Sequence, residues 1–260
     1  MDENRKVITW GIGFIVLLIV IGAVYYFFIR DTGKQQPAVT QVVEDMAEKV
    51  ESERVEQKPG ETEDLIQVDL DESDGLVRDL APSLTSHPEL AKWLLTEDLI
   101  RRFAAAVDNI ANGQSPRKHI DFFAPEGEFK VIEKRGHYII DPTSYGRYSK
   151  VAEVFSSLDS QVCVNLYRRF YPVIQQAYRD LGYPKGNFHR ALRQAIDELL
   201  GVPVIEGDVM LEAKLLSYGM AVPELEKLSP AQKHLFRMGP RNVRMIQTRL
   251  RELKSLLASR

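Results

Sequence analysis

The sequence predicts a mainly α-helical domain with two small β-hairpins, preceded by a single transmembrane helix. Apolar residues recur every three or four positions through most of residues 80–260, the period of a helix that buries one face. Residues 7–29, near the N-terminus, form an apolar run without any charge. Between these regions the chain is strongly acidic, with fifteen Asp and Glu against five Lys and Arg in residues 31–79.

Residues 7–29 are expected to cross the lipid bilayer, after a short N-terminal tail of residues 1–6. A helix rises 1.5 Å per residue, so this run spans about 35 Å, enough for a hydrocarbon core of about 30 Å. Trp10 lies near one end and Tyr25 and Tyr26 near the other, where aromatic rings favour the interface. The run is longer than the apolar core of a cleaved signal peptide, so we expect a permanent signal anchor.

The orientation of this anchor is only weakly indicated by the flanking charges. Arg5 and Lys6 precede the apolar run, and Arg30 and Lys34 follow it, so the two sides hardly differ. A short tail before the anchor and a large body after it are typical of a signal anchor whose body crosses the membrane. We therefore expect a single-pass protein of a bacterial inner membrane, with its globular domain in the periplasm.

Residues 30–79 are expected to form an acidic, disordered linker. Apolar residues are sparse there, so folding could not bury enough surface to offset the loss of chain entropy. Repulsion between like charges also extends such a segment. The simplest interpretation is a spacer that holds residues 80–260 away from the bilayer. The alternative is an acidic docking segment for a basic partner.

The body begins with two expected helices and a hairpin. A short helix runs from His87 to Leu95, and Thr96 then caps a longer helix that ends at Gly113. Residues 129–133 and 137–140 have the alternating pattern of strands, and residues 134–136 form the turn between them.

The rest of the body continues mostly as helices. Helices are expected over residues 143–155, 159–181 and 188–199, followed by a weaker hairpin in residues 204–217 that turns at Gly207 and Asp208. The last two helices begin at Pro230, capped by Ser229, and at Pro240.

A basic cluster lies at the break between these last two helices and consists of Lys233, His234, Arg237 and Arg241. The helical pattern turns the neighbouring apolar residues inward, so the cluster is explained as the solvated side of two helices. The alternative is an anion-binding corner, in which Arg241 and the first amides of the last helix are the donors.

Two other stretches carry residues that are suited to binding. Arg101 and Arg102 lie on the helix before Gly113, and Arg117 follows it closely, although a salt-bridged solvent face is the alternative there. Residues 141–148 combine tyrosine and arginine, the side chains that interfaces favour, although these rings could also form the rim of the core. The candidate binding residues are Arg101, Arg102, Arg117, Tyr145, Arg147, Tyr148 and Arg241.

No catalytic or metal-binding motif is visible. None of the five histidines belongs to a close pair with metal-ligand spacing, and the chain has neither a nucleophile elbow nor a phosphate-binding loop. Cys163, the single cysteine, excludes an intramolecular disulfide and is expected to be a small core residue. The sequence therefore predicts no catalytic residue, metal or cofactor.

Four separated motifs resemble a known family, the proteobacterial proteins catalogued as domain of unknown function 3014. They are HPELAKWLLTEDLIRRFAAAVDNIANGQSPR, YIIDPTSYGRYSKVAEVFSSLDS, LYRRFYPVIQQAYRDLGYP and LEKLSPAQKHLFRMGPRNVRMIQTRLREL, in this order. The resemblance covers most of residues 80–257. It implies an N-terminal membrane anchor and a variable linker before the shared domain, and it supplies no catalytic residues.

These features together predict a non-enzymatic module of the cell envelope that binds or assembles with an envelope protein. The alternative is an enzyme of unrecognised type that binds an anionic ligand at the arginine-rich corner. A pocket that gathers Arg102, Arg117, His234 and Arg241 would favour the enzyme. Nucleic acid is not an expected partner, because a net charge of +6 over residues 80–260 is modest and the linker is acidic. A homo-oligomer is compatible with the sequence.

Overall fold

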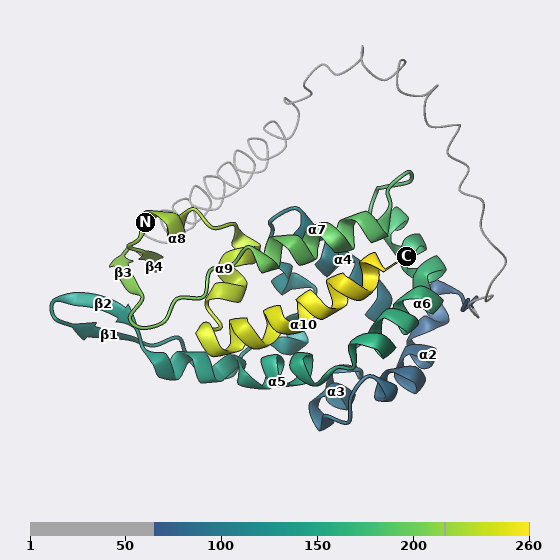
Figure 1. The fold of residues 1–260 in the computed structure, drawn as a ribbon, viewed down its shortest axis with the longest axis horizontal. Helices are drawn as coiled ribbons and strands as arrows, with labels where there is room; N and C mark the ends of the chain where they lie inside the picture. Colours follow the sequence, from purple (N-terminus) through teal and green to yellow (C-terminus); the bar gives the residue numbers. More distant parts are fainter. Residues whose placement is uncertain (1–64, 216, 260) are drawn as a thin grey trace, which may run out of the picture. The chain divides into compact units, whose positions relative to one another are not determined.

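The computed structural model describes residues 65–215 and 217–259, which form helices and one small sheet (Figure 1). This confirms the prediction of a mainly helical domain. The expected transmembrane helix, residues 7–29, lies outside the described residues, as does most of the expected linker. Within the described ranges, no helix combines the length and apolar character needed to cross a membrane.

The predicted helices occur in the predicted order, but α2 and α8 were not predicted, and the first half of the helix predicted over residues 143–155 is the 3-10 helix η5. The α-helices are α2 (Ser73–Leu80), α3 (Pro88–Trp93), α4 (Leu99–Ala111), α5 (Ser149–Ser157), α6 (Ser160–Asp180), α7 (Phe188–Leu200), α8 (Pro223–Glu226), α9 (Pro230–Phe236) and α10 (Pro240–Ala258). Short 3-10 helices are η1 (Leu70–Glu72), η2 (Ala81–Ser83), η3 (Pro116–Lys118), η4 (Asp121–Phe123) and η5 (Pro142–Tyr148). Ser229 caps α9 as predicted, since its side chain accepts a hydrogen bond from the backbone of Gln232.

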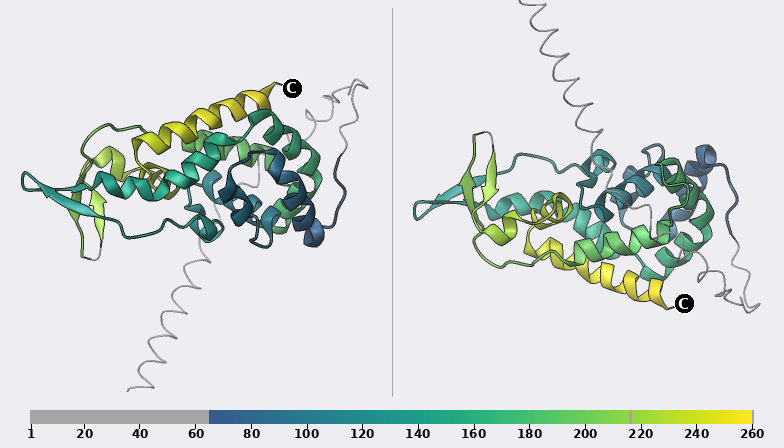
Figure 2. Two further views of the ribbon diagram at one scale, coloured as in Figure 1. Left: turned by 90° about the horizontal axis from the view of Figure 1, so that it is seen from below. Right: turned by 90° about the horizontal axis from the view of Figure 1, so that it is seen from above.

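The two predicted hairpins are not separate, because they join into one antiparallel sheet in the order β1-β2-β3-β4. The strands are β1 (Val131–Lys134), β2 (His137–Ile140), β3 (Met210–Ala213) and β4 (Tyr218–Met220). Pairing of Ile139 with Met210 connects the hairpins. Both views of Figure 2 show β1 and β2 extending from the helices at the end opposite the C-terminus.

The predicted turn of the second hairpin at Gly207 and Asp208 is wrong. Gly207 has a positive φ of 94°, but it bends the chain before β3 begins. The hairpin turns instead between Lys214 and Ser217, whose backbone groups hydrogen-bond to each other. A Gly-Asp pair is a strong local turn signal, and here that turn leads into the strand rather than out of it.

The helices bury two distinct apolar cores. The first core lies among α5, α9, α10 and the sheet, and includes Ala152, Leu235 and Val243. The second lies among α4, α6 and the start of α7, and includes Phe170 and Phe188. Tyr167 and Leu192 pack against both cores.

The fold begins before residue 80, the predicted start of the domain. Ile66 and Leu70 are buried in the second core, and the Ile66 amide donates a hydrogen bond to the carbonyl of Arg169 on α6. The apolar residues of this segment were not recognised, because residues 30–79 as a whole are strongly acidic. The predicted linker therefore includes residues that belong to the folded domain.

Asp74, in the same segment, caps α4 from a distance in the sequence. Its carboxylate accepts hydrogen bonds from the amides of Asp98, at 2.8 Å, and Leu99, at 2.9 Å. Asp98 takes a left-handed conformation with φ of 59°, and its own side chain makes no cap. The prediction of Thr96 as the cap was therefore wrong, because the helix starts later and receives its cap from α2.

Replacement of the capping carboxylate tests whether this segment stabilises the domain. We expect Asp74→Ala to lower the free energy of unfolding of the full chain by about 1–2 kcal/mol, as lost helix caps do. Asp71→Ala is the matched control, because the Asp71 side chain is 76% exposed and its ion pair with Arg101 is worth at most about 1 kcal/mol. Equal, small losses in both variants on denaturant titration would contradict this role.

Candidate anion-binding site

The predicted binding residues separate into two groups in the structure. Arg117, Arg147 and Tyr148 line one pocket, although they lie on η3 and η5, which are far apart in the sequence. Arg101, Arg102 and Arg241 do not line it and instead form ion pairs. The structure thus brings together only part of the predicted set.

The ion-paired arginines have local partners that neutralise them. Arg101 pairs with Asp71 and Asp98, Arg102 pairs with Asp121 at 2.9 Å, and Arg241 pairs with Glu153 at 3.5 Å. These contacts match the alternative prediction for Arg101 and Arg102, a salt-bridged solvent face. Exposed pairs of this kind contribute little to stability.

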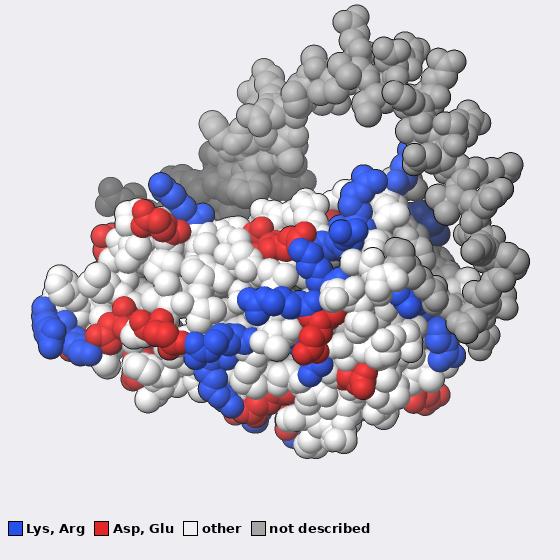
Figure 3. Space-filling view, in the orientation of Figure 1, with Lys and Arg blue, Asp and Glu red and all other residues white. Residues whose placement is uncertain are grey.

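Many charges of α10 are paired in the same way. Arg244 pairs with Glu206, and Lys254 pairs with Asp197 of α7. In the view of Figure 3, several blue side chains adjoin one another over α7 and α10, with red side chains beside them. This surface carries both signs of charge.

Tyr145 has a structural position at the break between α9 and α10. Its ring packs so closely against Gly239 that a side chain there would collide with it, and Gly239 has a positive φ of 85°. The buried Asn242 side chain donates hydrogen bonds to the carbonyls of Tyr145, at 3.0 Å, and Met238, at 2.9 Å. These contacts fix the direction in which α9 ends.

The end of α9 supplies the remaining residues of the basic pocket, a hollow of about 170 Å³. We use this name for the pocket lined by Arg117, Arg147, Tyr148, His234 and Arg237, with further lining from η4. Among the described residues, no carboxylate forms an ion pair with any of its three arginines.

One acidic residue, Asp121, also lines the basic pocket, but its charge is balanced by Arg102. Single arginines without an ion pair are common on protein surfaces. Three of them around one small hollow leave a local excess of positive charge, which an anion can neutralise with charge-assisted hydrogen bonds. The basic pocket is therefore suited to a carboxylate or phosphate group.

His234 forms part of the inner wall of this pocket. Its Nδ1 atom lies 3.4 Å from the Ser115 hydroxyl. Burial lowers the pKa of His234 below its ordinary value, and the charges of Arg237 and Arg117 lower it further. The imidazole is therefore neutral at pH 7, and it gains a proton more easily when an anion enters.

Arg147 and Tyr148 also border a second hollow, which lies beside the sheet. This sheet pocket, of about 620 Å³, shares Arg147, Tyr148 and Arg237 with the basic pocket and is otherwise lined mainly by β3, β4 and Phe129. Arg147 lies 5.7 Å from the centre of the Tyr148 ring, and its Nε donates to the carbonyl of Glu126 at 3.2 Å. The arginine is thus oriented at the boundary between the two pockets.

An apolar cavity of about 400 Å³ lies behind the basic pocket, between the two cores. Its lining includes Tyr167 and Leu192, the two side chains that contact both cores. The cavity and the basic pocket have five lining residues in common, which are Ile120, Phe123, Val151, His234 and Met238. A charged hollow therefore adjoins an apolar one across a shared wall.

The polar side chains that line the cavity either have a hydrogen-bond partner or are kept uncharged by burial. The Tyr167 hydroxyl lies 3.0 Å from Nδ1 of His189. Burial raises the pKa of the Cys163 thiol to about 11, so this cysteine is protonated and poorly nucleophilic at neutral pH. Such a lining favours apolar groups over water, which needs two to four polar partners.

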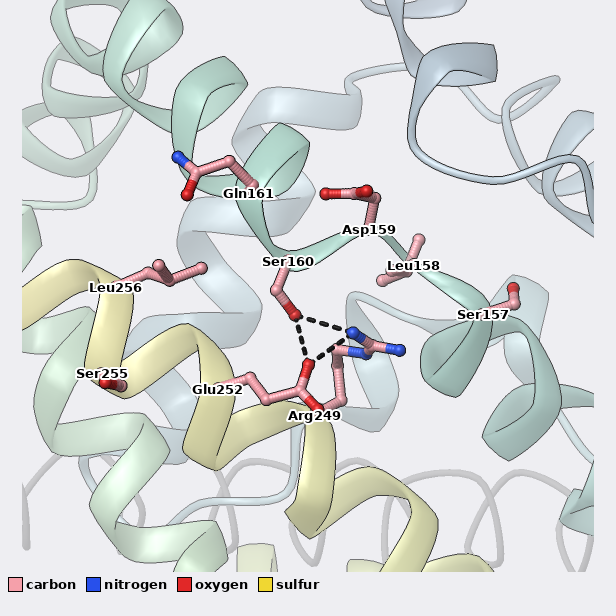
Figure 4. Close-up of a pocket in the computed structure, with 9 residues that line it drawn as sticks. All are labelled: Ser157, Leu158, Asp159, Ser160, Gln161, Arg249, Glu252, Ser255 and Leu256. Atoms are coloured by element: carbon pink, nitrogen blue, oxygen red, sulfur yellow. Dashed lines mark hydrogen bonds and ion pairs between the residues drawn. The ribbon is translucent and has the colours of Figure 1, made fainter.

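A further hollow, of about 650 Å³, contains a serine, an arginine and a glutamate in contact (Figure 4). Arg249 donates to the Ser160 hydroxyl at 2.8 Å, and Ser160 donates to Glu252, also at 2.8 Å. Arg249 also donates to the carbonyl of Ser156. These bonds join α10 to the junction of α5 and α6, and the described residues that line this hollow include no histidine to activate the serine.

The described residues also contain no cluster of three or more His, Cys, Asp or Glu side chains able to hold a metal ion. The groups that the basic pocket presents to a ligand are three arginines, their hydrogen-bond donors and one neutral imidazole.

Arg237 was not among the predicted binding residues and was expected to face solvent. Of the four residues whose gathering in one pocket would favour an enzyme, Arg117 and His234 line the basic pocket, and Arg102 and Arg241 do not. The spacing of His234, Arg237 and Met238 on one side of a helix end was the only local signal. Only the tertiary fold brings His234 and Arg237 close to Arg117 and Arg147.

Comparison with known proteins identifies one family. The model of a family described as "Protein of unknown function (DUF3014)" matches residues 99–254, from the start of α4 into α10. No curated protein and no solved structure matches the chain. The matched range includes every residue of the basic pocket.

The charge around His234 can be tested by titration. We expect Arg237→Gln to raise the pKa of His234 measured by NMR, because a nearby positive charge is removed. Arg241→Gln is the control, because Arg241 pairs with Glu153 and does not line the pocket. An unchanged pKa in Arg237→Gln would contradict this arrangement.

The same shift predicts how stability depends on pH. The folded pKa of His234 lies below its unfolded value of about 6.5, so the unfolded state binds more protons as the pH falls. This contribution to stability is complete above about pH 6.5 and is lost as the pH falls through the folded pKa. We expect His234→Gln to reduce the loss of stability between pH 7 and pH 5, measured by denaturant titration.

Proposed function

The chain belongs to the DUF3014 family of proteins of unknown function, and from this premise we propose that it is a membrane-anchored, non-enzymatic binding protein that recognises an anionic group at its basic pocket. The observation that carries the proposal is the set of three arginines around one hollow. Arg117 lies on η3, Arg147 on η5 and Arg237 directly after α9, and no carboxylate of the described residues pairs with them. An anionic partner would supply the missing counter-charge.

The proposed place of action is the bacterial envelope. Residues 7–29 would anchor the chain once in the inner membrane, and the acidic segment that follows would hold the domain away from the anionic bilayer surface. The domain would then face the periplasm and bind an envelope component that carries a carboxylate or phosphate. The charge of that component, rather than a catalytic step, is what the pocket recognises.

A second candidate function is an enzyme that acts on an anionic ligand. The observation in its favour is that the imidazole of His234 is neutral, with its Nδ1 atom 3.4 Å from the Ser115 hydroxyl. A neutral imidazole can accept a proton from a substrate held by the surrounding arginines. A bell-shaped or rising pH–rate profile that His234→Gln abolishes, on any phosphate or carboxylate ester, would favour this alternative over binding alone.

The anion site can be tested with pyrophosphate as the probe. We expect the triple variant Arg117→Gln, Arg147→Gln, Arg237→Gln of the full chain to weaken pyrophosphate binding at least tenfold, because each arginine can make a charge-assisted hydrogen bond. Isothermal titration calorimetry measures the change. The matched control is Arg101→Gln, Arg241→Gln, Arg244→Gln, which removes the same charge from ion-paired sites. Equal weakening in both triples would contradict a specific site.

The proposed orientation can be tested with fusions at Arg260. We expect an alkaline phosphatase fusion to be active and a green fluorescent protein fusion to be dark, because the phosphatase needs the periplasm for its disulfides. Fluorescence without phosphatase activity would place the domain in the cytoplasm and overturn the proposed localisation.

A further inference from the structure

We propose that the apolar cavity and the basic pocket form one binding site for a single-chain anionic amphiphile. The alkyl chain would occupy the cavity, and the carboxylate or phosphate head would lie among the arginines of the basic pocket. The inference rests on the proposed function, because it uses the same anion site. It adds the class of ligand that the site takes.

The two hollows share a wall. Ile120, Phe123 and Val151 line both, together with His234 and Met238. The two hollows are therefore adjacent, and a ligand that passes between these mostly apolar side chains would occupy both. A compact anion such as phosphate would use only the smaller hollow, of about 170 Å³.

The lining of the apolar cavity suits a hydrocarbon chain. Apart from His234, Cys163 and Tyr167, its lining residues are apolar, and Ala195 and Ile196 of α7 are buried in it. Apolar cavities exclude water and bind hydrocarbon, whereas polar ligands would leave their hydrogen bonds unmade there. The cavity is thus matched to an alkyl chain rather than to a sugar or nucleotide.

The size of the apolar cavity matches a single alkyl chain. The cavity volume is about 400 Å³, and a methylene group is close in size to a water molecule, which takes up about 30 Å³ in the liquid. The cavity therefore holds roughly a dozen carbon atoms, or one chain of medium length. A second acyl chain of this length would not fit, which excludes an intact diacyl phospholipid from complete burial.

The protein carries its own reporter for the test. Cys163 is the single cysteine of the chain, and it lines the cavity rather than the basic pocket. An alkyl chain in the cavity would shield its thiol from a small maleimide. Inorganic pyrophosphate, bound only in the basic pocket, would leave the thiol as reactive as before.

The experiment uses the full chain in nanodiscs of phosphatidylcholine and follows modification of Cys163 by N-ethylmaleimide at alkaline pH, because the raised pKa of the thiol makes the reaction slow at neutral pH. We expect dodecyl phosphate to slow the reaction at least tenfold and saturably, and pyrophosphate to leave the rate unchanged. The Arg117, Arg147, Arg237 triple variant should need at least tenfold more dodecyl phosphate for half-protection. The Arg101, Arg241, Arg244 triple should behave as the wild type.

Two further arms identify the head group and the path. Protection by dodecanoate at lower concentrations than dodecyl phosphate indicates a fatty acid, and the reverse order indicates a phosphate-bearing lipid. Ala195→Phe places a ring in the cavity at a residue that does not line the basic pocket, so it should abolish protection by dodecyl phosphate while pyrophosphate still binds. An unchanged melting temperature of this variant shows that it folds.

The results separate this inference from the proposed function. Pyrophosphate binding that depends on the arginines, without protection of Cys163 by either amphiphile, overturns the inference and leaves the anion site intact. Failure of pyrophosphate and both amphiphiles to bind overturns both. Protection that is equal in the two triple variants shows nonspecific partition of the amphiphile, and it too overturns the inference.

Discussion

The structure depends on how its two apolar cores meet. The helices α6 and α7 run through both cores, and Tyr167 on α6 and Leu192 on α7 contact each of them. At this junction the cores do not merge, and the apolar cavity lies between them. Protein interiors are usually packed as densely as organic crystals, so a cavity of about 400 Å³ is a departure that calls for an explanation. Burial of an alkyl chain would provide one.

The position of the basic pocket depends in turn on the break between α9 and α10. Gly239 has the positive φ that this corner needs, and the Tyr145 ring occupies the space that any larger residue would take. Asn242 bonds the first turn of α10 to the carbonyls of Tyr145 and Met238. These contacts end α9 so that His234 and Arg237 reach the pocket lined by η3 and η5. The conformation of Gly239 therefore positions His234 and Arg237 in the site.

Local signals in the sequence predicted most of the helices, but not the features that depend on distant contacts. Spacing of apolar residues and the Ser229 and Pro240 signals placed α9 and α10, because caps and amphipathic faces act within a few residues. The joining of the hairpins through Ile139 and Met210, and the capping of α4 by Asp74, link residues that are far apart in the chain.

The candidate site shows the same division between local and distant information. The sequence named Arg117, Arg147 and Tyr148, since arginine and tyrosine favour binding surfaces. It could not separate them from Arg101 and Arg241, whose counter-charges are known only from the fold. The sequence did not predict the cavity, because the apolar residues that line it have the same helical spacing as ordinary core residues.

The most direct test of a continuous site is to locate the two ends of a bound amphiphile. Full chain with labelled methyl groups in nanodiscs, mixed with dodecyl phosphate, would be studied by intermolecular nuclear Overhauser effects. The account predicts contacts from the terminal methyl group of the ligand to Val164 and Leu250, which line the cavity and not the basic pocket. Contacts confined to Val151 and Met238, with none to Val164 or Leu250, would contradict it.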